Sequence, residues 1–473
     1  MTKVLVTEQN LQNIANSIRA KNGSSDTYKP GQMSTAIDNI PTSGIISVSS
    51  VSINTYSGTT QNMYLRPDGT DGKTDLPVSA TVLPANATIP DLRWTSSDPT
   101  KAEVIYDAVN ATYKVHAKSA GTVTITATSV ESGEYDSFTV VVATPTWAVI
   151  KQFVQAGNIL QLMDVGDKIP TVVNFKTTSS SSTSYNTSIT LVHLLDTATK
   201  QAKYGLNSNG AIFQYTDLTR NGLPYDRPET ALEATEETAQ DGVYYYGWNS
   251  GSTYTELNLT TGDTIPYGDY AKVYKSSINT TGANYNQIRG NGWNNWKYSM
   301  IRQWLNSDAA ASSQEWFTPS HIGDGSPTAA QLNYAGWMND IDQDLAAAVV
   351  QATIKTSSNT VTDGGVAYTT NDKFFLPSKE EVYANPQVAG EEGEVWDFYK
   401  NNTGYPSASD SYTPARMKIQ YPTTSQPQNF AYWWLRSAFR SGAYNVFCID
   451  GGGIASTSYA YTATSLAPAC IIA

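Results

Sequence analysis

Two short runs of alternating residues constrain the fold of this chain more than any other feature. In residues 122–128 and 138–142, apolar side chains recur at every second position, the period of a half-buried β-strand. Stretches rich in Gly, Asp, Ser and Pro separate these runs from their neighbours. Residues 45–144 hold one tryptophan, Trp94, and no cysteine. We therefore expect residues 45–144 to form an all-β sandwich without a disulfide.

Residues 1–44 show a helical period instead. Thr7 precedes an apolar stripe of i, i+3, i+4 and i+7 spacing, and Pro30 sits where the first turn of a second helix tolerates proline. The stripe and its continuation in the second helix are Leu11, Ile14, Ala15, Ile18, Met33, Ile37 and Ile40. So short a module buries little surface by itself, so we expect it to dock on a partner or on copies of itself.

Residues 145–473 mix both periods, which predicts an α+β domain. Residues 147–155 and 298–306 have helical spacing, whereas residues 177–188 are a low-complexity run typical of a hairpin tip. Ser378 and Glu381 are spaced as a capping box and predict a short helix. The carboxylates of Glu391, Glu392 and Glu394 are interpreted as a solvated acidic loop.

Composition excludes several classes of function. The formal net charge is −12 and only 15% of residues are charged, a balance that disfavours binding to phosphate backbones of nucleic acids. No run approaches the ~18 consecutive apolar residues of a membrane span, and the first ten residues lack the apolar core of a signal peptide. We expect synthesis in a cytoplasm without Sec export.

The sequence also lacks the common catalytic and metal-binding motifs. It contains no GxSxG, HExxH or phosphate-loop pattern, and its two cysteines, Cys448 and Cys470, fit neither a disulfide framework nor a zinc site. We expect no cofactor and no enzymatic activity. A structural calcium ion is conceivable in a lectin-like fold, but no carboxylate cluster of EF-hand spacing supports it.

Four motifs carry a family resemblance. WAVIKQFVQAGNILQLMDVGDKI, WNNWKYSMIRQWLN, FFLPSKEEVY and YWWLRSA follow one another over residues 147–438. Together they resemble a domain of undefined biochemistry at the ends of tail proteins of phages that infect Gram-positive bacteria, related to the C-type-lectin-like and formylglycine-generating-enzyme fold. Members commonly end in Gly-Val-Arg-Pro-Ala. Here residues 465–469 read Ser-Leu-Ala-Pro-Ala, without the arginine.

The remaining segments fit the same kind of protein. Residues 83–104 and 117–128 resemble group 2 bacterial immunoglobulin-like domains, which are usually spacers, and the N-terminal module resembles leaders of phage tail proteins. The resemblance thus implies a helical attachment module (1–44), an immunoglobulin-like spacer (45–144) and a C-type-lectin-like receptor-binding domain (145–473).

The last 39 residues, 435–473, have a restricted repertoire. They contain no Lys, Glu, Gln, Met or Trp, although proportional use would place about six there. Codons with a pyrimidine in the third place cannot encode any of these five residues. Diversity-generating retroelements produce such codons when they randomise the two adenines of AAY codons, which encode Asn and in which Y is a pyrimidine. Residues 436–466 resemble the variable repeats of those systems. A Ser/Thr/Gly-rich β segment poor in long side chains is the simpler alternative.

In such repeats, fixed small or apolar residues alternate with mutable surface positions. On that pattern the scaffold positions are Arg440, Ser441, Ala443, Val446, Phe447, Ile449, Gly453 and Ala455. The mutable, ligand-binding positions are Phe439, Gly442, Tyr444, Cys448, Asp450, Gly451, Gly452, Ile454, Ser456, Thr457, Ser458, Tyr459, Tyr461, Thr462 and Thr464.

The sequence therefore favours a phage or prophage tail protein that binds a host-surface protein or glycan and catalyses nothing. It would reside in the virion tail and contact tail or baseplate proteins through residues 1–44. It could form a homotrimer, and no nucleic-acid or membrane partner is expected. A bacterial surface adhesin shares this architecture. A formylglycine-generating-type oxidase is the third interpretation, for which only Cys448 and Cys470 are available to hold copper.

Overall fold

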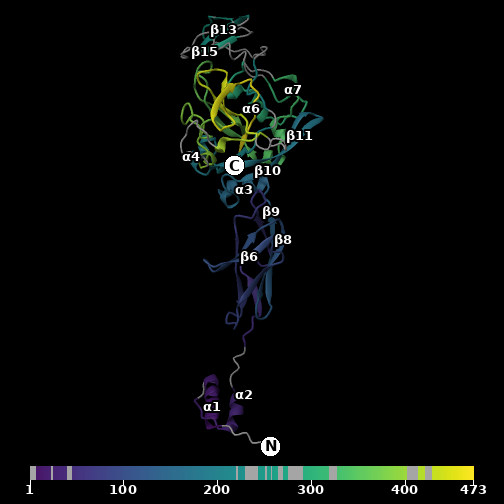
Figure 1. The fold of residues 1–473 in the computed structure, drawn as a ribbon, viewed down its shortest axis with the longest axis vertical. Helices are drawn as coiled ribbons and strands as arrows, with labels where there is room; N and C mark the ends of the chain where they lie inside the picture. The colour runs from purple at the N-terminus through teal and green to yellow at the C-terminus, as the bar shows by residue number, and fades with distance from the viewer. Residues whose placement is uncertain are drawn as a thin grey trace.

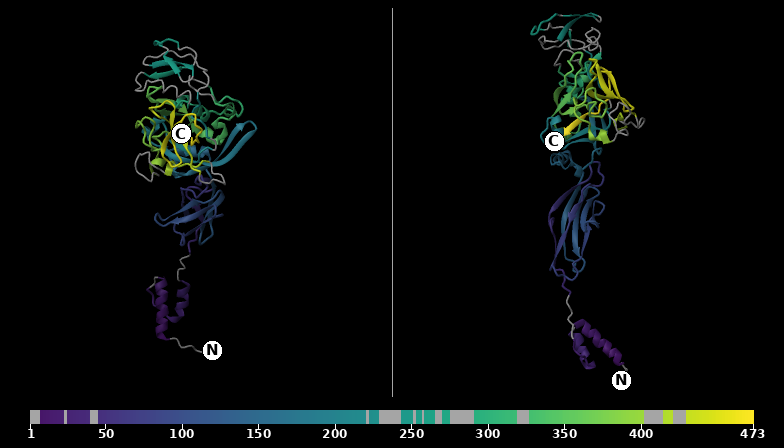
Figure 2. Two further views of the ribbon diagram at one scale, coloured as in Figure 1. Left: turned by 45° about the horizontal axis from the view of Figure 1, so that its top comes forward. Right: turned by 90° about the vertical axis from the view of Figure 1, so that its left-hand side faces the viewer.

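A computed structural model shows the arrangement of the chain (Figure 1). It describes residues 7–22, 25–39, 45–219, 222–228, 243–250, 253–256, 258–264, 270–274, 291–318, 327–401, 414–420 and 429–473. A small helical unit, a β-sandwich and a larger α+β head follow one another along the long axis (Figures 1 and 2). The chain is thus multidomain, with a small helical N-terminal part and mostly β-structure elsewhere.

The helical unit is a hairpin of α1 (Glu8–Asn22) against η1 (Pro30–Gln32) and α2 (Met33–Asp38). The Thr7 hydroxyl accepts a hydrogen bond from the amide of Asn10 at 3.3 Å, as expected at a helix start. The buried contact consists of Ala15, Ile18, Met33 and Ala36. Ile14 and Ile37, from the predicted stripe, remain 44% and 50% exposed. Ile40 lies outside the described residues.

The sandwich follows from the alternating runs. Side chains 123, 125 and 127 of β8 and 138, 140 and 142 of β9 are buried, as the period predicts. Trp94 lies half-buried beside Tyr113, with ring centroids 6.1 Å apart. The first sheet has the strand order β2 (Thr60–Tyr64), β9 (Tyr135–Ala143), β8 (Gly121–Ser129), β5 (Leu92–Ser96). The second has the order β3 (Leu76–Val78), β7 (Thr112–Ala117), β6 (Ala102–Asp107), and the third pairs β1 (Ser50–Ile53) with β4 (Ala80–Leu83).

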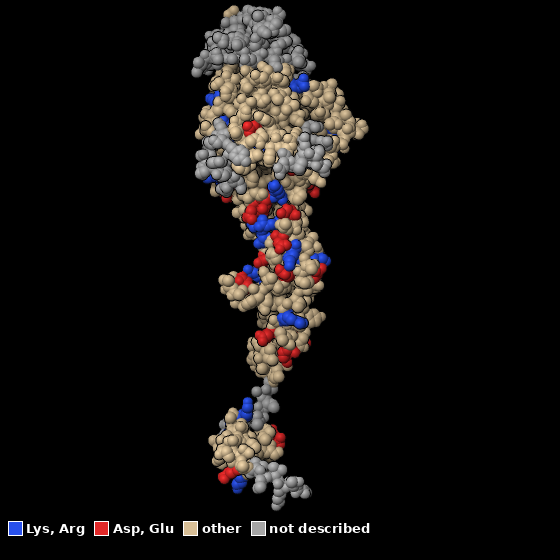
Figure 3. Space-filling model, in the orientation of Figure 1, with Lys and Arg blue, Asp and Glu red and all other residues tan. Residues whose placement is uncertain are grey.

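An ionic joint connects the sandwich to the head. Arg66 and Lys73 of the sandwich pair with Asp164, and Arg66 also pairs with Asp167. Tyr64 packs edge-on against Phe153 of the head at 6.0 Å. In the view of Figure 3, charged side chains gather on the sandwich and around this joint, whereas the described surface of the head shows few.

The core of the head surrounds one large sheet. Its path is β10 (Lys168–Thr178), β11 (Ser181–Leu195), β12 (Gly210–Tyr215), β23 (Ala469–Ile472) and β16 (Val349–Val350), and β19 (Phe374–Phe375) also pairs with β23. The C-terminal strand β23 therefore lies in the middle of the sheet, far in sequence from all its neighbours. Helix α3 (Trp147–Gln155), predicted with these bounds, packs on this sheet, with Trp147 edge-on to Phe213 at 5.8 Å.

Shorter elements complete the head. They are η2 (Ile159–Gln161), α4 (Ala198–Lys203), β13 (Val243–Ser250), β14 (Thr253–Glu256), β15 (Tyr270–Tyr274), η3 (Trp296–Tyr298), α6 (Met300–Leu305), α7 (Ala329–Leu332), α8 (Trp337–Asp340), α9 (Gln343–Ala348), β17 (Ala352–Thr356), β18 (Tyr368–Asp372), α10 (Asp397–Asn401) and η4 (Pro414–Arg416). The run at 177–188 forms the turn and one arm of the β10–β11 hairpin. Helix α6 confirms the period of residues 298–306.

Candidate recognition face

The predicted variable segment forms a separate antiparallel sheet on the head. Its strands are β20 (Trp433–Ala438), β21 (Asn445–Ile449) and β22 (Ala455–Tyr459), with β21 in the middle. Every residue of β20 is buried, whereas β22 is at the edge of the sheet and its residues are exposed or half-buried. In the right-hand view of Figure 2, the yellow C-terminal strands lie along the outer side of the head. Exposure therefore increases from β20 to β22.

Most predicted ligand-binding positions have accessible side chains or backbone. Ile454, Thr457, Tyr459 and Tyr461 are exposed. The half-buried positions are Phe439, Tyr444, Asp450, Gly451, Gly452, Ser456, Ser458 and Thr462. The structure brings these residues together on β22, on the turn before it and on the segments that flank the sheet.

Three predicted ligand-binding positions lie in the interior, contrary to the expected surface exposure. Cys448 is in the central strand β21 with its side chain in the core. The carbonyl of Gly442 accepts a 2.6 Å hydrogen bond from the Asn294 side chain. Thr464 exchanges backbone hydrogen bonds with Leu223 at 3.0 and 3.2 Å. Because each of these residues fills a packed or paired position, the structure does not offer it to a ligand.

The predicted scaffold positions lie mainly beneath this surface. Ala443, Val446, Phe447, Ile449 and Gly453 are buried, and Arg440 and Ala455 are half-buried. Ser441 differs from the expectation, because it is exposed in the turn between β20 and β21. Alternation thus places Val446 and Ile449 of β21 correctly but not Cys448, because this strand is buried on both faces. It also fails in the turn, where a strand period no longer applies.

Tyrosines dominate the accessible side chains. The Tyr459 ring centroid lies 5.3 Å from that of Tyr444 and 5.9 Å from that of Tyr461. Burial raises the pKa of the Tyr444 hydroxyl above its ordinary value, so this group is neutral at physiological pH. The Asp450 carboxylate instead accepts the amides of Gly452 and Ile454 at 2.8 and 2.9 Å and holds the turn between β21 and β22. The cluster is aromatic and uncharged.

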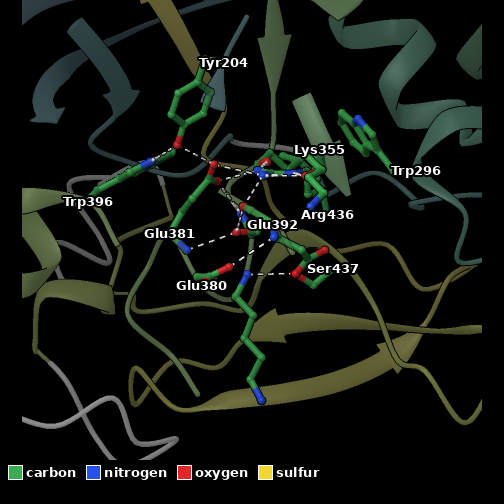
Figure 4. A network of polar contacts seen from close by, with 12 residues as sticks. Tyr204, Trp296, Lys355, Glu380, Glu381, Glu392, Trp396, Arg436 and Ser437 are labelled. Atoms are coloured by element: carbon green, nitrogen blue, oxygen red, sulfur yellow. Dashed lines mark hydrogen bonds and ion pairs between the residues drawn. The ribbon is translucent and has the colours of Figure 1, made fainter. Parts of the chain in front are cut away.

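A buried polar network supports β20 from below (Figure 4). The Arg436 guanidinium donates to both carboxylate oxygens of Glu381 and to the carbonyls of Leu376 and Glu392. Glu381 also accepts the Tyr204 hydroxyl at 2.9 Å. All of these side chains exclude solvent, and burial raises the pKa of Glu392 above its ordinary value.

This network corrects two expectations. Glu392 does not belong to a solvated loop, because it is 4% exposed and accepts the amide of Ser357. Ser378 and Glu381 do exchange the hydrogen bonds of a capping box, at 2.8 and 3.1 Å, but they close a turn and not a helix. The Glu381 carboxylate is shared with Arg436, and Tyr383 takes a positive φ of 55° that ends helical continuation. The one sequence signal for a buried partner of Glu381 is Arg436, an arginine within the apolar run YWWLRSA.

The two cysteines lie in different sheets, Cys448 in β21 and Cys470 in β23. Both are free and buried. Burial raises the pKa of the Cys448 thiol to about 12 and that of Cys470 likewise far above its ordinary value. Copper binding needs thiolates, which this environment disfavours.

Within the described residues, no group of three or more His, Cys, Asp or Glu side chains is arranged to hold a metal ion. In the same part of the chain, no helix combines the length and the apolar character that crossing a bilayer requires.

Two protein-family models match parts of the chain. Residues 71–140 match the model described as Bacterial Ig-like domain (group 2). Residues 71–140 are therefore a bacterial Ig-like domain. Residues 270–473, which include the whole β20–β22 sheet, match a model described as Domain of unknown function (DUF6273). No curated protein matches the chain.

Proposed function

We propose that this chain is a receptor-binding protein of a phage or prophage tail, and that the accessible surface around β22 recognises a ligand on the host cell. In this proposal the helical hairpin attaches to the tail, the Ig-like domain is a spacer, and the head has a C-type-lectin-like fold diversified by a retroelement. The protein resides in the virion and acts by binding alone.

One observation carries the proposal. Residues 435–473 lack Lys, Glu, Gln, Met and Trp. These are the five residue types that NNY codons, those with a pyrimidine in the third place, cannot encode. Within that segment, the positions inferred to be mutable are accessible on the edge strand β22 and its flanks, with the exceptions of Gly442, Cys448 and Thr464. Diversification benefits a binding protein only where a changed side chain meets the ligand and leaves the core intact. The accessible positions on β22 and its flanks satisfy both conditions, whereas Gly442, Cys448 and Thr464 do not.

The chemistry of this surface also fits recognition. Tyrosine offers a large contact area at low entropy cost, and Ser, Thr and Gly adapt their hydrogen bonds, as in antibody paratopes. Tyr459 and Tyr461 are 44% and 43% exposed. Neighbouring exposed aromatic residues are uncommon on a protein surface without a partner. Three copies on one tail would raise weak contacts to useful avidity.

Adsorption of the full-length protein to cells tests the proposal. Labelled protein is mixed with cells of a strain that the phage infects, and the Tyr459→Ala/Tyr461→Ala variant is compared with the native chain. We expect at least about tenfold weaker binding, because aromatic anchors commonly contribute more than 1.4 kcal/mol each. Tyr135→Ala is the matched control, because Tyr135 is 66% exposed on the Ig-like domain. Equal loss in both variants, or no adsorption of the native chain, would contradict the proposal.

The same protein should be present in purified virions. Its detection in virions by mass spectrometry agrees with a tail protein, whereas its confinement to the bacterial envelope would point to an adhesin.

A further inference from the structure

The outer edge of β22 presents backbone groups to solvent. The amide of Asp450 donates to the carbonyl of Ile454 at 2.9 Å, and the amide of Ala460 donates to the carbonyl of Tyr444 at 2.8 Å. Both bonds keep the β21–β22 register, in which Cys448 faces Ser456 and Val446 faces Ser458. The even-numbered residues of β22 therefore direct their backbone groups toward β21.

The odd-numbered residues consequently direct theirs away from the sheet. These residues are Ala455, Thr457 and Tyr459. Their N–H groups point away from β21, and so do the carbonyl groups of Ala455 and Thr457. The Tyr459 carbonyl is occupied, because it accepts the amide of Thr462 at 2.9 Å. Within the described part of the chain, no strand pairs with this edge. At about 3.4 Å per residue, the free groups extend over roughly 14 Å.

Soluble proteins normally protect such an edge with a lysine, a proline, a bulge or a covering segment. Strand β22 reads Ala-Ser-Thr-Ser-Tyr, and it pairs with β21 in an unbroken register. It thus contains no charge, no proline and no bulge. The NNY repertoire inferred for this segment excludes lysine altogether. An edge that no described strand covers, lying within the candidate recognition surface, is suited to binding another strand.

We propose that β22 binds an extended polypeptide segment of the host ligand by strand addition. The ligand class is therefore protein and not glycan, an inference that rests on the proposed function. The edge complements a peptide backbone electrostatically, since N–H and C=O groups alternate along both. The side chains of β22 itself are uncharged. On the turn before it, the Oδ1 atom of Asp450 accepts the amides of Gly452 and Ile454. Backbone pairing supplies affinity for any sequence, and the diversified side chains select among sequences.

Proline at position 457 tests the backbone contact directly. Thr457→Pro removes an outward N–H and leaves the pairing with β21, as proline does on edge strands. It is compared with Thr457→Ala, which loses the same hydroxyl but keeps the N–H. With the full-length protein and cells of the infected strain, we expect the proline variant to bind at least about tenfold more weakly than the alanine variant. Equal binding of the two would overturn strand addition.

A second arm tests the ligand class without any variant. Cells are treated either with a broad protease or with periodate, which oxidises sugars, before the native protein is added. We expect protease to abolish adsorption and periodate to leave it unchanged. Adsorption that survives protease or is lost with periodate would overturn a polypeptide ligand. If Thr457→Pro does not fold, as shown by the loss of its cooperative thermal transition, Ala455→Pro takes its place and is compared with the native chain. If neither proline variant folds, the protease and periodate treatments decide.

The remaining outcomes separate the two proposals. Native protein that does not adsorb to cells contradicts the proposed function and this inference together. Adsorption that depends on Tyr459 and Tyr461 but not on the N–H of Thr457 contradicts strand addition alone. Light scattering measures the molar mass of the native chain and of Thr457→Pro, and so shows whether two copies of the chain pair through this edge. A dimer that the proline dissolves would show that the edge binds a second copy, and would overturn the inference.

Discussion

At the scale of single residues, the head buries two ionisable side chains, Arg436 and Asp340, in contrasting surroundings. The Arg436 guanidinium has two carboxylate oxygens and several carbonyls as acceptors, and its side chain is 1% exposed. Asp340 is equally buried, but one of its carboxylate oxygens has no hydrogen-bond partner. Arg436 is paired with a carboxylate, whereas one oxygen of Asp340 has no partner, so replacing these two side chains should change the stability of the head in opposite directions.

Arg436→Ala should strongly destabilise the head. It leaves the Glu381 carboxylate buried without its cation, which typically lowers the free energy of unfolding by about 3–5 kcal/mol. Arg440→Ala is the control, because its 3.1 Å pair with Glu391 is partly exposed and such pairs contribute about 1 kcal/mol or less. Urea unfolding followed by tryptophan fluorescence measures both. Similar losses for the two variants would contradict this role of Arg436.

Asp340→Asn should stabilise the head at alkaline pH. Burial raises the pKa of Asp340 to about 8, only partly opposed by the amide and charge of Lys176. The folded state therefore keeps a proton that the unfolded chain releases near pH 4, and stability falls as the pH rises from 4 to 8. Asparagine removes this dependence.

The expected gain of the asparagine variant over the native chain is on the order of 5 kcal/mol at pH 8, from a pKa difference of about four at roughly 1.36 kcal/mol for each pKa unit, and near zero at pH 4. Thermal unfolding at the two pH values measures the difference. Asp344→Asn, on an exposed position of α9, is the control and should change neither value. An Asp340→Asn variant that is less stable at pH 8 would contradict the assignment.

At the scale of elements, local pattern and long-range pairing contribute differently to the fold. The period of residues 147–155 predicts α3 with its observed bounds, and the alternation of residues 122–128 predicts the buried face of β8. These patterns arise from neighbouring residues and are visible in the sequence. The pairing of β23 with β12, β16 and β19 joins residues up to 261 positions apart, and no local period encodes it.

The candidate face shows the same division. Alternation places Val446 and Tyr459 correctly, because both lie in regular strands. It fails for Cys448, which lies in a strand with both faces covered, and for Thr464, which pairs with Leu223. The acidic residues Glu381 and Glu392 gave no sign of burial, because their partner Arg436 is far along the chain. Sequence patterns thus predict which elements form and not what covers them.

Deletion of residues 469–473 should abolish folding of the head and spare the Ig-like domain. The deletion removes β23 from the middle of the large sheet and exposes the edges of β12 and β16. Limited proteolysis with mass spectrometry should find residues 50–143 protected and the head digested. The Ig-like domain is the internal control. A protected head in the truncated protein would show that β23 is dispensable.

At the scale of the whole molecule, the joint determines how the head is presented. The Ig-like domain meets the head through Arg66 and Lys73, which share Asp164, and through the Tyr64–Phe153 contact. The joint is small and partly exposed, so its ionic contacts are sensitive to salt. A stiff joint would hold the candidate recognition face at a fixed angle to the Ig-like domain.

Arg66→Ala/Lys73→Ala should loosen this joint. With one spin label on β8 and one on β11, we expect a broader distance distribution than in the native chain, measured by pulsed electron resonance. Lys118→Ala is the control, since its pair with Glu103 lies within the Ig-like domain. Equal widths for all three proteins would contradict an ionic contribution to the joint.

The most direct test of the central claim, a diversified recognition face, is the DNA sequence downstream of the codon for Ala473. We predict a near-copy of the stretch that encodes residues 436–466, next to a reverse transcriptase gene. It should differ from the coding repeat only where it carries adenine, and those differences should fall at accessible positions such as Tyr444, Thr457 and Tyr459. The absence of a copy, or differences concentrated at buried Val446 and Ile449, would contradict the claim.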